Sequence, residues 1–261
     1  MEVLISCMNQ IDSSIIQQTN IRSNVLIINQ CSLNSEEFFT YLDNNNISHT
    51  ARVFHTTERG LARSRNMAIC HAMDDICLLC DDDEVLEDNY NDIITNAFKR
   101  YPQADIITFN VYSPRNKKYP VKVENVGYIG AMRTSSWEIA FRRESIIRKN
   151  ILFDTKMGSG TGNGGGEEVR FLFDCLKNGL KIIHVPIYIA TVRQTDSQWF
   201  HGYTDTYFIN QGWISRRLLG FPLGLCYIVY TSLTKYSAYK KDNTFIKAFT
   251  LQIRGMFKKV K

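Results

Sequence analysis

The sequence predicts an α/β protein whose mostly parallel sheet is covered by helices on both faces. Three observations lead to this fold class. Short apolar segments alternate with segments of helical character, as in consecutive βαβ units. The segment 76–80 is apolar throughout, as in a strand that is buried on both faces. The 261 residues, 44% hydrophobic and 22% charged, suffice for a large core and are unlike a disordered or fibrous chain.

Local signals, taken in chain order, predict the individual elements. Strands are expected at 3–7, 25–28, 51–55, 76–80, 106–111 and 181–185, the last of them stopped by Pro186. The polar segment after the first strand is expected to hold a helix. Residues 34–37 resemble a capping signal, which predicts a helix with Phe38, Phe39 and Leu42 on one side. Further helices are expected up to Met73, over 87–101 and over 167–178.

Two segments lack a clear period. Residues 115–143 are expected to form irregular structure and short strands that line one side of a cleft. Trp137 is either part of the core, which we favour, or a platform for a sugar ring. Residues 158–166 hold six glycines and fit GxGxxG, but no strand leads into them and no acid follows at the dinucleotide spacing. A mobile loop whose backbone a substrate approaches is the better interpretation.

The chain is expected to divide into a domain at 1–207 and a helical C-terminal extension at 208–261. The most apolar stretch of the extension, 218–230, is broken by Pro222 and falls short of the roughly 20 apolar residues of a membrane span. From Lys235 onward the charge is almost entirely basic. We expect subunit or core packing first, which favours a homo-oligomer, and peripheral membrane contact second. Nucleic-acid binding by the basic tail is not expected.

Charge and cysteine content indicate the cellular compartment. The formal charge is a modest +5, and the opening Met1-Glu2-Val3 lacks the cationic and apolar segments of a secretory signal. Seven cysteines, an odd number, favour reduced thiols in a cytoplasm. Cys77 and Cys80 lie three apart in one strand and therefore point to opposite faces, so they cannot chelate a metal together. We expect His55 at the surface and His184 and His201 in structural or acceptor-facing positions.

Four acids, Asp81 to Glu84, follow the central strand without a linker. They lie at the carboxyl end of that strand, the edge where ligands bind in open α/β sheets. Like charges so close are costly unless a cation neutralises them, and a divalent ion that shares a phosphate is the usual solution. A solvated acidic turn before a helix explains the same residues equally well.

An ordered set of motifs over residues 1–200 resembles the family 2 glycosyltransferases, which have the GT-A fold. The set consists of Gly60-Leu61-Ala62-Arg63-Ser64-Arg65-Asn66, the acids at the end of the next strand, Phe153-Asp154-Thr155-Lys156-Met157-Gly158-Ser159-Gly160, and Gly166-Glu167-Glu168. The resemblance makes Asp81 and Asp83 the acids of the DxD motif. It implies metal binding (Mn²⁺ or Mg²⁺) by Asp83 with Asp81, and contact of Asp81 and Asp82 with the nucleotide. Glu168 takes the position of the catalytic base, with Glu167 the less favoured choice.

The resemblance implies an inverting enzyme of bacterial type that moves a hexose from a UDP-sugar to a glycan acceptor on a lipid carrier or glycoprotein. Such an enzyme would extend a surface polysaccharide or an adhesin glycan, in the cytoplasm or at the inner face of the cell membrane. Arg59 or Arg65 could meet the diphosphate, with a solvated helix-face role equally open.

Two departures from the family pattern leave a competing hypothesis. Asn29-Gln30-Cys31-Ser32 stands where relatives carry adjacent aspartates, and an Asn29 carbonyl could replace the aspartate that accepts from uracil. Thr191-Val192-Arg193 stands where many relatives have a histidine, so no third protein ligand is assigned to the metal. The alternative is a catalytically inactive GT-A module that serves as an assembly partner.

Overall fold

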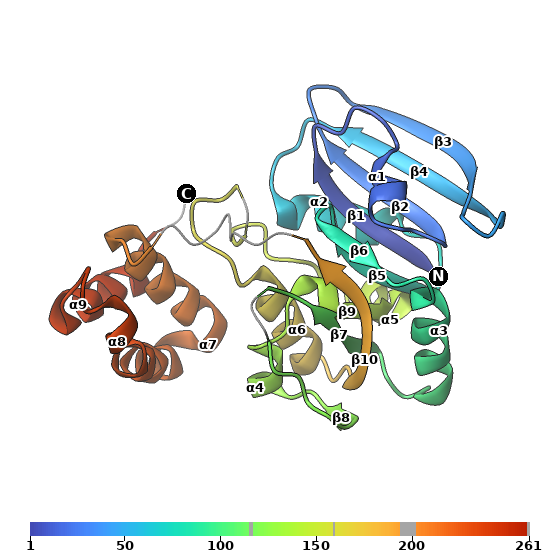
Figure 1. Cartoon of the computed structure of the whole chain (residues 1–261). Coiled ribbons are helices and arrows are strands. Elements are labelled where there is room, and N and C mark those ends of the chain that lie inside the picture. The colour runs from blue at the N-terminus through green and yellow to red at the C-terminus, as the bar shows by residue number, and fades with distance from the viewer. Residues whose placement is uncertain (115–116, 159, 194–201, 260–261) are drawn as a thin grey trace.

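The computed structural model describes residues 1–114, 117–158, 160–193 and 202–259. They form one ten-stranded sheet in the order β3-β4-β2-β1-β5-β9-β7-β10-β6, with β8 paired to β10, and the C-terminal helices α7 to α9 pack together at one side (Figure 1). The strands are β1 (Glu2–Met8), β2 (Asn24–Gln30), β3 (Ser35–Leu42), β4 (Ser48–Thr56), β5 (Ile76–Asp81), β6 (Glu84–Leu86), β7 (Ile106–Tyr112), β8 (Glu124–Asn125), β9 (Ile139–Arg142) and β10 (Ile182–Val192).

The longer helices are α2 (Leu61–His71), α3 (Tyr90–Arg100), α6 (Glu167–Lys177), α7 (Asp205–Thr234) and α9 (Phe245–Met256). Shorter helical turns are α1 (Ile15–Gln18), α4 (Tyr128–Ala131), the 3₁₀ turn η1 (Ser136–Glu138), α5 (Arg143–Arg148) and α8 (Tyr236–Tyr239). The α/β class with helices on both faces is confirmed. The sheet is mixed, because parallel pairs join β4, β2, β1 and β5 while the short β9 runs antiparallel between β5 and β7.

The helix predicted over 34–42 is wrong, because this segment is the edge strand β3, antiparallel to β4. Its side chains alternate: Phe39 and Tyr41 pack against the core, whereas Phe38 and Leu42 are exposed. The carboxylate of Asp43 accepts from the backbone N–H of Ile47 at 2.9 Å and closes the hairpin turn. A strand pairing along the whole of β4 outweighs a local capping signal.

The last predicted strand does not stop at Pro186. β10 continues to Val192, and its register against β7 shifts between Val185 and Tyr188. Proline has no N–H to donate to a ladder and is tolerated at such an irregularity. The strand thus reaches the edge of the sheet where β5 ends, and it pairs there with β6.

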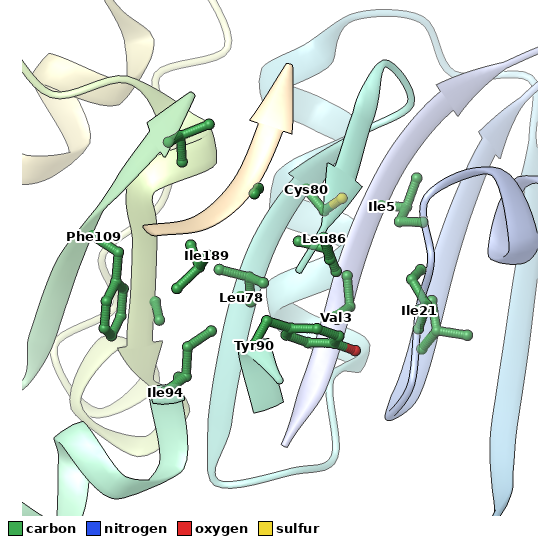
Figure 2. Close-up of a cluster of buried hydrophobic side chains, with 14 of the residues drawn as sticks. Val3, Ile5, Ile21, Leu78, Cys80, Leu86, Tyr90, Ile94, Phe109 and Ile189 are labelled. Atoms are coloured by element: carbon green, nitrogen blue, oxygen red, sulfur yellow. The ribbon is translucent and has the colours of Figure 1, made fainter. Parts of the chain in front are cut away.

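The two faces of β5 contribute to two separate cores, which bears out the prediction of a doubly buried strand. Leu78 and Cys80 pack with α3 on one face, and Cys77 and Leu79 pack with α2 and α6 on the other. Figure 2 shows the first face, where Tyr90 from the start of α3 lies beneath Val3 and Leu78. The central strand is therefore held rigidly from both sides, and so is the acidic turn that follows it.

Helices α7 and α9 cross with their backbones in direct contact. A Cβ at Gly212 would overlap the carbonyl oxygen of Gln252, and one at Gly255 would overlap that of Ile209. Helix α7 is kinked at Gly220, whose φ is +73°, two residues before Pro222. Among the described residues, no helix combines the length and hydropathy that a bilayer span requires.

Gly212→Ala is expected to destabilise the C-terminal helices by about 1–3 kcal/mol, because the added methyl group forces α7 and α9 apart. The melting temperature should fall by roughly 2–4 °C per kcal/mol. The matched control is Gly127→Ala, where a Cβ meets no atom within 4 Å. Equal melting temperatures of the two variants would contradict the close crossing.

Candidate active site

Arg65 of α2 joins acids from two distant parts of the chain. Its guanidinium donates to Asp81 at 2.8 Å, at the end of β5, and to Glu167 at 3.3 Å, at the start of α6. The side chain is only 3% exposed and its cationic end lies 5.5 Å from the centre of the Phe153 ring. A charge buried this deeply needs such partners, so Arg65 fixes α2, β5 and α6 relative to one another.

The acidic turn after β5 carries carboxylates in unequal environments. Asp81 accepts from Arg65 and, through its other oxygen, from Ser136 of η1 at 3.2 Å. Asp82 and Asp83 make no ion pair with the described residues. Burial, followed by neighbouring acids, raises the pKa of both, and raises that of Asp83 to about 6. These are the carboxylates that a cation would stabilise.

Glu84 is buried and belongs to the structure of the turn. One carboxylate oxygen accepts from the backbone N–H of Asp81 at 2.9 Å, and the other has no hydrogen-bond partner among the described residues. Burial and then the charge of Asp81 raise the pKa of Glu84 well above its ordinary value.

The chemistry of the turn fits a hard divalent cation that is shared with a ligand. No cluster of three or more His, Cys, Asp or Glu side chains within the described ranges is placed to hold a metal alone. Mg²⁺ and similar ions are commonly bound by one or two carboxylates plus substrate phosphates. Asp82 and Asp83, which lack a cationic partner in the described chain, are suited to that arrangement.

The two glutamates that open α6 also lie in unequal environments. Glu167 is 5% exposed, contacts Arg65, and lies against Gly158, where a Cβ would come within 2.8 Å of the carboxyl carbon. Glu168 is half-buried. Burial, followed by the charge of Glu167, raises the pKa of Glu168 to about 8. A carboxylate with its pKa near neutrality, beside a fixed partner, is suited to proton transfer.

Among the described residues, Asn29 and Arg59 form no hydrogen bond or ion pair with Arg65, Asp81 or Glu167. Asn29 is 1% exposed, and its side chain binds both backbone groups of Gln10 in a pocket of about 340 Å³ that His55 also lines. Arg59 lies in a second pocket of about 340 Å³, between the start of α2 and the segment 155–166, called the glycine loop below. Of the two arginines considered for a diphosphate, only Arg65 contacts the acids.

Sequence reasoning missed three contributions to the site. The contact of Ser136 with Asp81 spans 55 residues and leaves no local signal. The burial of Glu84 cannot be read from a run of four acids. His55 was expected at the surface, yet its ring lies 3.1 Å from the Asn29 amide and 3.2 Å from Glu37. The pairing of His55 with Asn29 across β2 and β4 gives this contact.

Two aromatic predictions have clear outcomes. Trp137 packs against the core, as favoured, and its indole N–H has no partner among the described residues. His184 is buried beside Thr108 at 3.1 Å and stacks on Tyr119, a structural position. His201 lies outside the described residues.

Comparison with solved structures supports the predicted GT-A fold. S. aureus TarS 1–349 in complex with UDP-GlcNAc matches with a TM-score of 0.63 at 12% identity, over 98% of this chain and 81% of that chain. The match to a longer S. aureus TarS structure covers 44% of that protein. The mannosyltransferase PcManGT from Pyrobaculum calidifontis, in complex with GDP-Man and Mn²⁺, matches with a TM-score of 0.50 at 14% identity, over 97% and 84%.

The sequence itself places the chain in a family. No curated protein matches it significantly. The profile described as glycosyl transferase family 2 matches residues 9–164, more than half of the chain and including the acidic turn and Arg65. The chain therefore belongs to glycosyl transferase family 2.

Proposed function

We propose that the protein is a metal-dependent, inverting glycosyltransferase that moves a hexose from a UDP-sugar to a glycan acceptor. The acceptor is carried on a lipid or a glycoprotein, and the product is a surface polysaccharide or an adhesin glycan made in the cytoplasm. The observation that carries the proposal is the Arg65 junction, which brings the acidic turn at Asp81 and the glutamates at the start of α6 into one site.

On the donor side, Asp83 and Asp81 would hold Mn²⁺ or Mg²⁺, with Asp82 beside the nucleotide. The ion, when bound, offsets the negative charge of the leaving diphosphate. Arg65, which is paired with Asp81, would place positive charge close to the diphosphate. A nucleotide-sugar donor is supported by the ligands of the two similar structures: TarS is in complex with UDP-GlcNAc, and PcManGT is in complex with GDP-Man and Mn²⁺.

On the acceptor side, Glu168 removes the proton of the attacking hydroxyl. The oxygen of that hydroxyl forms a bond to the anomeric carbon as the bond to the diphosphate breaks on the opposite face of the ring, which inverts the configuration. The raised pKa of Glu168 suits this role, whereas Glu167 is held by Arg65. The carbonyl oxygen of Asn29, our proposed acceptor for the base, also accepts from the backbone N–H of Gln10 at 3.0 Å and from the Cys7 thiol at 3.9 Å.

One observation favours the alternative of an inactive module. The buried side chain of Asn29 is already engaged by Gln10, which weakens its suitability as a uracil acceptor. Such a module would act through the helices of 208–261, for which we also propose contact between copies of the chain and, second, peripheral contact with the membrane. Metal-dependent release of UDP from a UDP-sugar, even if slow, would exclude an inactive module.

Asp83→Asn is expected to abolish metal-dependent donor binding, because it removes one of two carboxylate ligands for the cation. Thermal shift with UDP-glucose, UDP-galactose, UDP-GlcNAc and UDP-GalNAc, each with and without Mn²⁺, measures this, since a ligand that binds only the native state raises the melting point. Parental protein should gain about 2.7 kcal/mol at a hundredfold excess over Kd. Asp92→Asn, an exposed acid on α3, is the control and should behave as parental. No shift of the parental protein by any donor would refute the proposal.

A further inference from the structure

We infer that the pocket between the start of α2 and the glycine loop binds a phosphate group of the acceptor. The inference rests on the proposed function and names the substrate class: a glycan or polyol acceptor that carries a phosphate ester. The pocket is distinct from the acidic turn and measures about 340 Å³, within the range of small-molecule sites.

The walls of the pocket are cationic. Arg59, Arg63 and Lys156 all line it, and none of its described lining residues is acidic. Arg63 forms an ion pair with Glu58 at 3.4 Å, but Arg59 and Lys156 form no ion pair with described residues. The nearby Asp154 is already paired with Arg217. The pocket therefore carries uncompensated positive charge.

Hydrogen-bonding groups complete the pocket. Thr155, Thr161 and Asn163 line it along the glycine loop. Asn163 is 5% exposed and donates to the backbone carbonyl of Lys156 at 3.1 Å, which holds the two ends of the loop together. Cations beside hydroxyl groups form strong, charge-assisted hydrogen bonds with phosphate oxygens.

The position of the pocket favours the acceptor over the donor. The pocket that contains Asn29 also contains Ile27 and Val53, which belong to the α3 face of the sheet. Helix α2, which forms the cationic pocket, packs on the opposite face with Leu26 and Ile28. A donor whose base occupies the Asn29 pocket and whose diphosphate lies at the acidic turn leaves the cationic pocket free.

The glycine loop connects this pocket to the proposed base. Gly160 lies against Gly60 in the pocket wall, and Gly158, two residues earlier, lies against the carboxylate of Glu167. An acceptor anchored by its phosphate beside Arg59 is thus held by the same loop that leads to Glu168. Phosphate binding would orient the attacking hydroxyl, and neutral acceptors would lack that anchor.

Calorimetric titration of the full chain, saturated with UDP and Mg²⁺, tests the inference with glycerol 3-phosphate as probe and glycerol as its neutral counterpart. We expect saturable binding of glycerol 3-phosphate alone, weakened about tenfold or more in the double variant Arg59→Gln/Lys156→Gln through loss of charge-assisted bonds. The matched control, Lys99→Gln/Arg100→Gln on α3, removes the same charges from an exposed surface on the other face and should bind as parental.

Three results would overturn the inference: probe binding only when UDP is left out, weaker UDP binding in the pocket variant, or equal probe binding by both double variants. The first two would assign the pocket to the donor diphosphate. UDP binding and UDP release from the UDP-sugar, measured on UDP-free aliquots of the same proteins, test the proposed function separately. A glycosyltransferase with a neutral acceptor would keep both activities and bind no glycerol 3-phosphate.

Discussion

Glu168→Gln should bind the UDP-sugar with parental affinity and lose transfer by about 10²–10⁴-fold, the usual contribution of a positioned general base. Glutamine has nearly the same shape but cannot take a proton from the acceptor hydroxyl. The measurement is UDP release and sugar transfer under saturating donor, with donor affinity determined separately. Glu144→Gln, an exposed acid on α5, is the control and should retain parental rates.

The pH dependence gives the same prediction a second readout. Glu168 must be ionised to act as a base, and its pKa is raised to about 8. In the parental enzyme kcat/KM should therefore rise with pH and level off above about 8. Parental rates in Glu168→Gln, or a rise in kcat/KM that ends near pH 5, would show that another group is the base.

Stability should respond to Glu168 in the opposite sense to activity. The native state holds the proton of Glu168 up to about pH 8, whereas the unfolded chain releases it near the ordinary glutamate pKa of 4.5. The native state thus binds more protons between these values, and its stability falls as pH rises through that window. Glu168→Gln removes this penalty and should melt higher than the parental protein at pH 8. A variant that is inactive and more stable cannot owe its inactivity to misfolding.

The parts of the fold that the sequence predicted are those with strong local signals. The segment 76–80 is apolar at every position, so its burial on both faces and the placement of Asp81 at the edge followed directly. The helix at Glu167 had acids in its first turn and a glycine after its end, and it begins where expected. These two elements carry the proposed metal ligands and base.

The errors arose where pairing between distant segments decides the structure. Residues 34–42 carry a helix-start signal, yet β4 offers them a partner strand along their full length. Pro186 signals a strand end, but a shift in register lets β10 continue past it. The contact of Arg65 with Glu167 spans 102 residues, and nothing in the sequence near either residue specifies it. Local patterns thus predicted elements, and only the assembled sheet showed which side chains meet.

Arg65→Met is expected to have the largest effect on stability, about 3–5 kcal/mol, because it leaves Asp81 and the buried Glu167 without their shared cation. Methionine fills similar volume against Phe153, so lost packing contributes little. Urea unfolding without added metal, which could otherwise replace the missing charge, measures the effect. Arg148→Met removes an arginine from an exposed pair with Glu144 and should cost less than about 1 kcal/mol.

A second variant separates charge from packing at the same position. Arg65→Met/Glu167→Gln removes one of the two stranded carboxylates and should recover part of the stability lost in Arg65→Met, a coupling of about 0.5–3 kcal/mol. Additive losses would mean that Arg65 and Glu167 do not interact in solution. The Arg65 junction brings the acidic turn and the proposed base into one site. If Arg65 and Glu167 did not interact, the structural basis for placing donor and acceptor chemistry together would also be lost.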